Sequence, residues 1–256
     1  MRKVLIPVLA LSLAAGANAQ LAAARAMMAP ALSDLGYTDQ YSIVISGNEN
    51  DGSTLTNLWA RVSFMRTTAG VPYLEFLTYR NTTLLNRVVA DGTFLWNYDA
   101  EKNSYWSWAY TQVPTGQTPE QAILMMFKRA VPGSYGVLTQ TMVEANEVRR
   151  IGTGSMQSRW RPWQPLSNVL TSSTQIIANA NTPRVSQTTY NISTPVPGTT
   201  RITAIDFNEN GSGVKSGYYT QWSATFQHGT LVPSTDFTFT PPAGSRATAI
   251  QLASGG

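Results

Sequence analysis

Apolar and polar residues alternate along much of the chain, in short runs separated by turn-forming residues. A period of two is typical of β-strands with one buried and one exposed face. Within residues 55–67, for example, Leu58, Ala60, Val62 and Phe64 fall on one side of the predicted strand. Such short, closely spaced runs indicate antiparallel neighbours and a mainly β protein. Strands are predicted at 41–46, 55–67, 73–79, 84–89, 93–98, 105–110, 184–193, 200–207, 214–228 and 237–240.

A cluster of turn residues at 208–213 is predicted to join the last two long strands. Asp206, Asn208 and Asn210 also copy the first half of a calcium-binding loop. The position that should hold the bidentate glutamate is Gly217, so a hairpin turn explains these residues better than a metal site.

Three segments have helical features. Residues 21–35 are rich in Ala, with Pro30 expected to kink or divide the helix and Gly36 to end it. Thr118 and Gln121 can form a capping box around Pro119, which predicts a helix to about Ala130. This helix is apolar almost all round, so we expect it to be covered on most sides. A weaker helix is expected near 166–170.

The N-terminus has the features of an export signal. Arg2 and Lys3 precede the apolar stretch 4–15, and the run 17–19, Ala-Asn-Ala, matches the small-x-small pattern after which signal peptidase cuts. The stretch is shorter than the roughly 20 apolar residues that a spanning helix needs. Residues 1–19 are therefore predicted to be a signal peptide, 20–252 one domain, and 253–256 a disordered tail.

Charge and cysteine content narrow the possible functions. Charged residues make up 12% of the chain, about half the usual share. The net charge of +4 falls to +2 without Arg2 and Lys3, and the basic residues are scattered, which disfavours nucleic acid as a partner. The chain has no cysteine, so it has neither disulfides nor the attachment point for a lipoprotein anchor.

Little in the chain indicates catalysis. His228 is the single histidine, and no G-x-S-x-G motif accompanies it. A zinc site of His and Cys ligands is excluded by these counts. We therefore expect no enzyme activity, no metal and no cofactor.

Aromatic residues and methionine are the unusual feature. The chain has 7 Trp and 8 Met. Trp59, Trp96, Trp106 and Trp108 lie on predicted strands, and Met126 lies on the apolar helix with Met125 and Phe127 beside it. Methionine adapts to irregular partners and suits a pocket for flexible chains. An ordinary core between sheet and helix explains the same residues.

Three motifs resemble one family of proteins. The run 89–99, VADGTFLWNYD, is similar to a hairpin of the periplasmic carriers of outer-membrane lipoproteins, the LolA/LolB type. Residues 115–119, TGQTP, followed by the apolar helix, resemble the segment that comes next in that family. Residues 237–244, FTFTPPAG, are similar to its closing strand. The motifs occur in the family's order and span most of the chain after the signal.

The resemblance implies an unclosed antiparallel β-barrel, or half-barrel, with helices covering a concave apolar face. It implies that acyl chains of lipids or lipoproteins are held between sheet and helices, with membrane-bound donor or acceptor proteins as partners. Arg66 lies nearest to a basic residue that the family uses in passing cargo on. The resemblance and the pattern together predict that ligand-binding residues are Trp59, Phe64, Arg66, Leu74, Phe76, Trp96, Met126 and Phe127.

We therefore expect a soluble, monomeric periplasmic protein that binds acyl chains. The alternative is an envelope stress sensor, or a structural protein that uses the same fold as a docking surface. A carrier needs an apolar space, whereas a docking protein should have a filled core.

Export is the first testable expectation. Protein purified from the periplasm should begin near Gln20, because the small residues before it match the cleavage pattern. N-terminal sequencing measures this directly. Recovery of Met1 from a membrane fraction would contradict the prediction.

Overall fold

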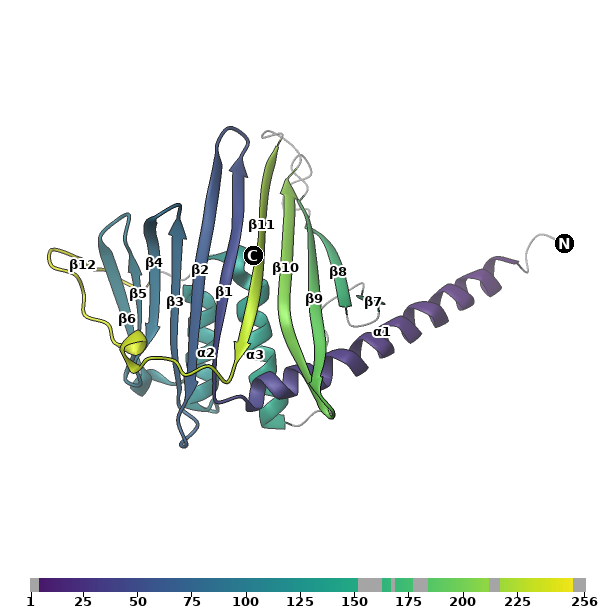
Figure 1. Ribbon diagram of the computed structural model, residues 1–256, viewed down its shortest axis with the longest axis horizontal. Coiled ribbons are helices and arrows are strands. Elements are labelled where there is room, and N and C mark those ends of the chain that lie inside the picture. Colours follow the sequence, from purple (N-terminus) through teal and green to yellow (C-terminus); the bar gives the residue numbers. More distant parts are fainter. Residues whose placement is uncertain (1–4, 152–162, 167–168, 177–183, 212–216, 251–256) are drawn as a thin grey trace.

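The computed structural model describes residues 5–151, 163–166, 169–176, 184–211 and 217–250. Within these ranges the chain forms one twelve-stranded sheet and three α-helices (Figure 1). The strand order is β12-β6-β5-β4-β3-β2-β1-β11-β10-β9-β8-β7, and the two end strands do not pair with each other, so the sheet is unclosed. Among the described strands only β12 and β6 pair in parallel. The predicted half-barrel class is confirmed.

The strands on the β6 side of the sheet follow one another as the sequence predicts. They are β1 (Gln40–Asp51), β2 (Leu55–Arg66), β3 (Pro72–Arg80), β4 (Thr83–Ala90), β5 (Phe94–Asp99) and β6 (Ser104–Ala109). The other side is made of β7 (Trp163–Leu166), β8 (Val169–Ile176), β9 (Arg184–Val196), β10 (Thr199–Gly211) and β11 (Tyr218–His228), and the short β12 (Arg246–Ala247) lies beside β6.

Three predictions of local structure are wrong. The expected helix at 166–170 is replaced by the antiparallel strands β7 and β8. The expected turn at 208–213 begins too early, because β10 stays paired with β11 as far as Asn210. Residues 237–240 form no strand: a 3-10 turn, η4 (Ser234–Phe237), leads into a segment that crosses the sheet instead of joining it. The predicted tail at 253–256 lies outside the described residues.

The first helix, α1 (Leu5–Tyr37), runs through Pro30 without dividing. Its side chains at 24, 28, 31, 32 and 35 are buried, a spacing that keeps one stripe against α3 and β10. Pro30 is exposed, on the side away from that stripe. The N-terminal half of α1 extends away from the sheet (Figure 1). The five buried positions just named follow the predicted cleavage site, so cleavage would leave them in place.

The second helix, α2 (Pro119–Ala130), begins as predicted. Thr118 and Gln121 form both hydrogen bonds of the capping box, at 3.3 and 3.0 Å, around Pro119. The residues buried along this helix are Ala122, Ile123, Leu124, Phe127 and Ala130. None of the described helices is both long and apolar enough to cross a membrane.

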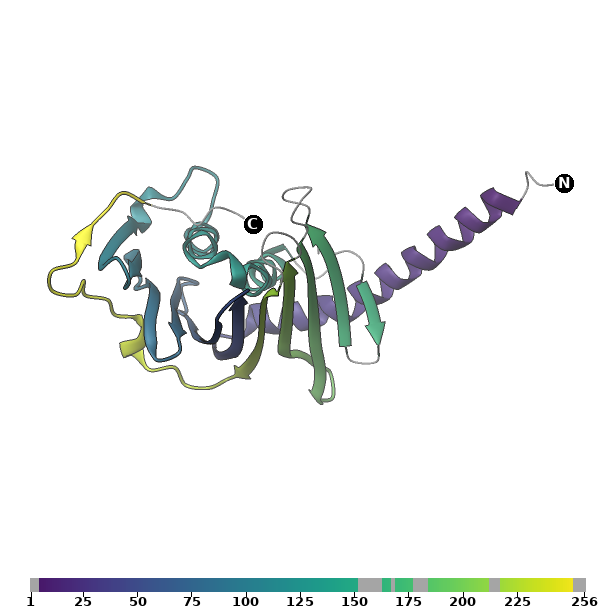
Figure 2. The same ribbon diagram turned by 90° about the horizontal axis from the view of Figure 1, so that it is seen from above.

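The third helix, α3 (Gly136–Ile151), was not expected from the sequence. It buries Leu138, Met142, Ala145 and Val148, which have helical spacing. Thr139, Thr141 and Asn146 are buried among them, and these polar residues interrupt the apolar pattern. Figure 2 shows the sheet curving around α2 and α3.

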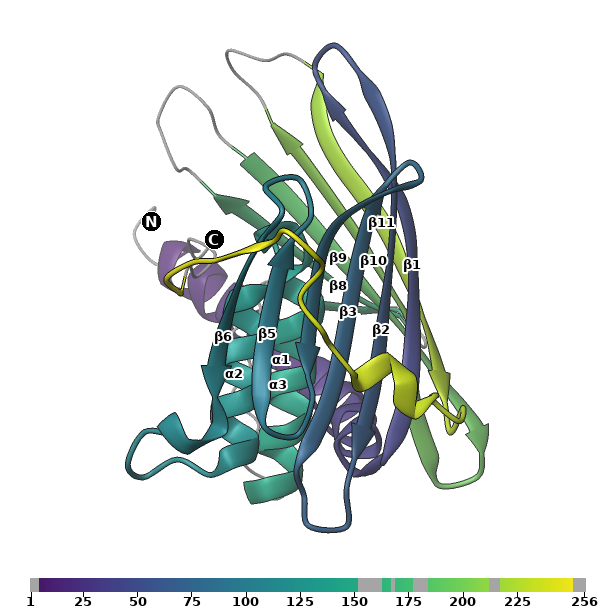
Figure 3. The same ribbon diagram turned by 90° about the vertical axis from the view of Figure 1, so that its left-hand side faces the viewer.

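Each strand therefore has an inner face, which meets the helices, and an outer face. Phe64, Leu74 and Ala90 are successive cross-strand partners on the inner face of β2, β3 and β4. Ser63, Glu75 and Val89 are the corresponding partners on the outer face. The C-terminal segment, residues 229–250, crosses this outer face (Figure 3).

A buried charge network attaches the C-terminal segment to the sheet. The Glu75 carboxylate lies 2.7 Å from the guanidinium groups of both Arg61 and Arg87. Asp236 accepts a hydrogen bond from Ser63 at 2.8 Å and lies 3.2 Å from Arg61. The Glu75 side chain is 2% exposed, so its two arginine partners compensate for the loss of water.

Replacing Glu75 tests this attachment. The substitution Glu75→Gln leaves two guanidinium groups beside a neutral amide, and should lower the free energy of unfolding by about 3 kcal/mol. The matched control is Glu101→Gln, which breaks an exposed pair with Arg80 and should cost less than about 0.5 kcal/mol. Urea denaturation measures both, and equal losses would contradict a structural role for Glu75.

Candidate functional site

The space between the inner face and the helices is the predicted place for an acyl chain. It is occupied by a continuous apolar layer that includes side chains from the sheet and all three helices. Phe76 from β3 contacts Phe127 of α2 edge to face, with ring centres 6.3 Å apart. It also contacts Tyr135, just before α3, at 5.2 Å. We call this the apolar layer.

Five of the predicted ligand-binding residues lie in or beside the apolar layer. Phe64, Leu74, Phe76 and Phe127 are fully buried there, and Met126 is half-buried at its margin. These side chains come from β2, β3 and α2, so the structure brings together residues far apart in the sequence. Their role in ligand binding stays a prediction.

Trp59 and Trp96 lie on the opposite, outer face, and their predicted inner placement is wrong. Trp59 is 37% exposed and contacts Tyr79. Trp96 donates a hydrogen bond to Asp91 at 2.7 Å and lies against Phe239 of the C-terminal segment. Successive side chains of a strand point to opposite faces. Trp59 and Phe64 are five residues apart, an odd number, so β2 cannot present both on the same face.

Trp106 and Trp108 of β6 take the inner positions, and both are buried in the apolar layer. Trp108 is the partner of Leu95, which is also inner. The sequence could have predicted this placement. In the β5–β6 hairpin, even-numbered residues of β6 pair with odd-numbered residues of β5, so both sets lie on one face of the sheet. On the other side of the sheet, Tyr190 and Trp222 also enter the layer.

The apolar layer is closely filled by side chains. Ile43, Leu138 and Phe76 have no exposed surface. A hollow of about 420 Å³ lies on the outer face of β1, β11, β10 and β9, where Phe207 and Trp222 of the layer also border it, and one of about 280 Å³ lies between the end of α1 and the β9–β10 turn. Because the side chains named above are fully buried, an acyl chain would need the helices to move away from the sheet.

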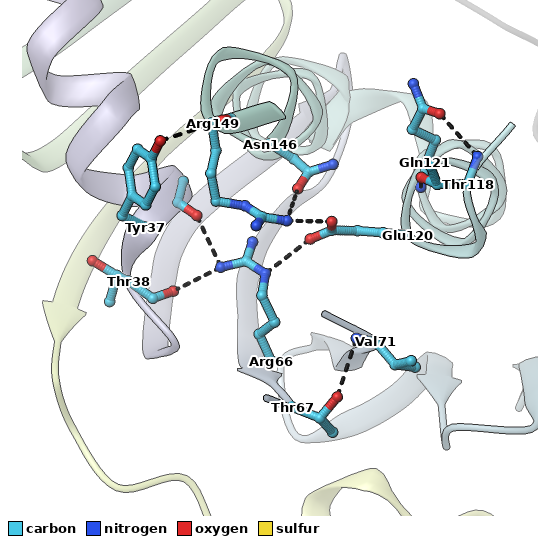
Figure 4. A network of polar contacts seen from close by, with 11 residues as sticks. Tyr37, Thr38, Arg66, Thr67, Val71, Thr118, Glu120, Gln121, Asn146 and Arg149 are labelled. Atoms are coloured by element: carbon cyan, nitrogen blue, oxygen red, sulfur yellow. Dashed lines mark hydrogen bonds and ion pairs between the residues drawn. The ribbon is translucent and has the colours of Figure 1, made fainter. Parts of the chain in front are cut away.

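Arg66 lies at one end of the layer, at the last residue of β2, where it joins the sheet to the helices (Figure 4). Its Nε donates to Glu120 at 2.8 Å, and its Nη1 donates to the carbonyl oxygen of Gly36 at 2.8 Å. A weaker contact reaches the Thr38 carbonyl at 3.4 Å. The Arg66 side chain is 5% exposed. It therefore connects β2, the end of α1 and the start of α2.

Glu120 extends this connection to α3. Its second carboxylate oxygen accepts a hydrogen bond from Arg149, which also donates to Asn146 at 3.2 Å. Glu120 lies in the first turn of α2, where a negative charge also interacts favourably with the helix dipole. We call Arg66, Glu120, Arg149 and Asn146 the Arg66 cluster.

The close crossing of α1 and α3 beside this cluster depends on Gly36. A Cβ atom at Gly36 would lie 2.3 Å from the carbonyl oxygen of Ala145, closer than real side chains approach. The absence of a side chain allows the two helix backbones to meet there, and leaves the Gly36 carbonyl within reach of Arg66. The end of α1, its crossing point with α3 and the Arg66 cluster therefore lie together and support one another.

A buried polar pair lies elsewhere in the layer. The hydroxyl groups of Tyr190 and Thr141 share a hydrogen bond of 3.0 Å, which links β9 to α3. Burial raises the pKa of the Tyr190 phenol well above its usual value of about 10, so the group stays neutral. It serves as a hydrogen-bonding group and carries no charge into the layer.

The single histidine has a position typical of a structural residue. His228 Nε2 donates to the carbonyl oxygen of Ile202 at 2.8 Å, and Nδ1 lies 3.8 Å from a carboxylate oxygen of Asp34. No serine or threonine hydroxyl bonded to this ring is seen in the described chain. In the same part of the chain, no group of three or more acidic or histidine side chains is placed to hold a metal ion.

Comparisons with known proteins give similarity of fold only. No family model matches the chain, and no curated protein matches it in sequence. Among solved structures, it is similar to LprF from Mycobacterium bovis, with 12% identity, a TM-score of 0.35, and coverage of 87% of this chain and 97% of that one.

Two further structures are similar. A conserved protein from Thermus thermophilus has 12% identity and a TM-score of 0.38, with coverage of 85% and 94%. A domain described as an outer membrane lipoprotein-sorting protein, from Vibrio parahaemolyticus, has 8% identity and a TM-score of 0.36, with coverage of 79% and 91%. At these scores, function must be argued from this chain's own residues.

The Arg66 cluster can be tested by removing one charge. The substitution Glu120→Gln leaves Arg66 and Arg149 without a carboxylate, and should lower the free energy of unfolding by about 3 kcal/mol. It should also speed amide hydrogen exchange in α2 and at the end of α1 more than in β1 and β2.

The control is Glu147→Gln, at an exposed position of α3. It should change stability by less than about 0.5 kcal/mol. Uniformly faster exchange over the whole protein in Glu120→Gln would show that the cluster has no particular role in holding the helices.

Proposed function

We propose that the protein binds acyl chains of lipids or lipoproteins between the inner face of the sheet and the helices α2 and α3. The observation that carries this proposal is the apolar layer itself. It extends from Trp108 on β6 to Tyr190 on β9, and so is wide enough to cover a long chain. The helices that contribute to it meet the sheet mainly through apolar contacts.

The energetics support a closed form that opens around a ligand. Burying an acyl chain of about 16 carbons would remove about 12 kcal/mol of unfavourable contact with water, at about 0.8 kcal/mol per methylene. Side chains that now fill the layer would lose contacts with one another but gain similar contacts with the acyl chain. Apolar contacts are not directional, so such an exchange is possible without new polar partners.

The helix α2 is the element best placed to move. It lies against β3, β4 and β5 and is linked to α3 by residues 131–135, which include Pro132 and Gly133. Met126 lies at its margin, and methionine can repack around an irregular partner. The Arg66 cluster holds the N-terminal end of α2 by an ion pair, whereas at the other end Asn97 of β5 donates a hydrogen bond of 3.3 Å to the Ala130 carbonyl oxygen. This weaker link to the sheet favours opening at the C-terminal end of α2.

This function requires neither catalysis nor a cofactor. The predicted signal peptide supports a location in the periplasm, where the protein would hold acyl chains away from water. Delivery to or from membrane-bound partners is the further step that a carrier of this kind would need.

A second candidate is a protein that docks a partner and carries no cargo. The filling of the apolar layer favours it, because a docking protein needs a rigid core and no internal space. The two candidates differ in one measurable property, the binding of an acyl probe.

Two neighbouring methionines provide a matched test. The wild-type protein should bind a palmitate analogue that carries a fluorescent group. The substitution Met126→Glu places a charge at the margin of the layer and should weaken binding by about tenfold or more. Met125→Glu changes a side chain that is 36% exposed on the same helix, and should change affinity by less than about twofold.

Far-UV circular dichroism of both variants checks that the fold is retained. Equal weakening in the two variants would contradict binding in the layer. Absence of binding to the wild-type protein would reject the acyl-chain proposal in favour of docking.

A further inference from the structure

The larger of the two hollows lies on the outer face of the sheet. It has a volume of about 420 Å³, within the range of about 300–1,000 Å³ typical of ligand sites. Four adjacent strands, β1, β11, β10 and β9, form its floor. Figure 1 looks onto this face: the C-terminal segment crosses its lower part, and the part of β1, β11 and β10 nearer the β1–β2 hairpin is uncovered.

Two rows of side chains run across the strands here. The first row begins with two aromatic rings and continues with hydroxyl groups and one carboxylate. In order of strand pairing, it consists of Tyr79, Trp59, Ser46, Ser223, Asp206 and Thr189. Its six strands are spaced by about 4.8 Å each, so the row is about 24 Å long.

The second row lies two residues further along each strand, and all its side chains are carboxamides. It consists of Asn57, Asn48, Gln221, Asn208 and Gln187. Gln221, Asn208 and Gln187 line the hollow and are exposed to solvent. Five carboxamides opposite one another on five strands form a continuous band of hydrogen-bond donors and acceptors.

The charge of the hollow limits what it can bind. Among the described residues of its lining, Asp206 is the one acidic side chain, and it already accepts a hydrogen bond from Asn191 at 2.8 Å. That described lining includes no lysine or arginine, the cations that a nucleic acid or a lipid phosphate requires. The side chains in the hollow are mostly polar, whereas the centre of a protein–protein interface is usually apolar.

The ligand class that fits this lining is a neutral, polyhydroxylated chain. Sugar hydroxyl groups both donate and accept hydrogen bonds, as carboxamides and hydroxyl side chains do. The apolar faces of sugar rings stack on aromatic rings, and Trp59 presents such a ring at the end of the first row. Its 37% exposure and its tilted contact with Tyr79, 5.0 Å between centres, give an amphipathic platform beside the polar band.

We propose that this outer hollow is a binding site for a neutral oligosaccharide, with Trp59 as its stacking platform and Asn208 and Gln221 as its central hydrogen-bonding groups. The length of the rows favours an extended chain of several sugar units over a single sugar. The site lies on the face opposite the apolar layer, so it does not depend on acyl-chain binding.

Titration with three neutral hexasaccharides, chitohexaose, cellohexaose and maltohexaose, tests the proposal by calorimetry and by tryptophan fluorescence. At least one should bind the wild-type protein with a dissociation constant below about 1 mM, the strength expected of a shallow, polar site. A sulfated heparin hexasaccharide should not bind, because the described lining offers no cation to pair with its charges.

The variants assign the binding to the hollow. Trp59→Ala should weaken it by about tenfold through loss of stacking, and Asn208→Ala combined with Gln221→Ala by a similar factor. Thr225→Ala is the control, since Thr225 is exposed on the same face of β11 but outside the hollow. It should change affinity by less than about twofold.

Three results would overturn the proposal: no binding of any neutral hexasaccharide, equal loss in Trp59→Ala and Thr225→Ala, or preferential binding of the heparin fragment. Melting temperatures of the variants should match the wild type, because the changed side chains are on the exposed face. The Met126→Glu variant should bind the sugar normally, which separates this site from the acyl-chain site.

Discussion

The register of the antiparallel sheet is the constraint on which both faces of this protein depend. Side chains alternate between the faces, so the pairing of Phe64 with Leu74 also sets the pairing of Ser63 with Glu75. A shift of β3 by one residue would turn Glu75 toward the helices and Phe76 toward the outer face. The apolar layer and the attachment of the C-terminal segment would both be lost. One set of strand pairings therefore satisfies two different chemical requirements at once.

The few charged residues are concentrated where they join distant parts of the chain. Glu75 and Asp236 are far apart in sequence and meet around Arg61. Arg66 and Glu120 join the sheet to α2. Asp34 near the end of α1 pairs with Arg201 on β10 at 3.1 Å. Buried or half-buried pairs of this kind are costly to break one partner at a time, so they make the arrangement of elements specific.

The sequence was sufficient for the features that depend on local chemistry. The capping box at Thr118 and the alternation in β2 and β3 predict their elements to within one or two residues. It was not sufficient for α3, because Thr139, Thr141 and Asn146 are buried by tertiary partners, such as Tyr190 for Thr141, that no local pattern reveals. The failure at 237–240 has the same origin. Phe237 and Phe239 alternate as in a strand, yet their partners are Tyr73 and Trp96 on the outer face of the sheet.

In the candidate site, too, residues that follow a local pattern were predicted and residues that depend on tertiary contacts were not. The sequence predicted the burial of Phe64, Leu74 and Phe76 because they alternate with polar residues along their strands, and that of Phe127 because its helix is apolar almost all round. It misplaced Trp59 and Trp96 because large aromatic residues were assumed to be inside. Both are on the outer face, where Trp96 is covered by Phe239 and Trp59 is left exposed. Composition alone cannot distinguish a covered aromatic residue from an exposed one, since the difference depends on where the C-terminal segment crosses.

The two faces also differ in how their contacts respond to movement. The C-terminal segment is bound to β2, β3 and β4 through directional bonds, including those of Arg61, Glu75 and Arg87, so it braces this half of the sheet. The helices meet the sheet mainly through apolar contacts, which can be exchanged for contacts with a ligand, and through scattered polar contacts such as those of Arg66 and the Arg201–Asp34 pair. Movement of the helices therefore costs less free energy than deformation of the sheet, which stays fixed. A frame that stays fixed keeps the outer rows in register, so the outer hollow retains its shape whether the helices are closed or open.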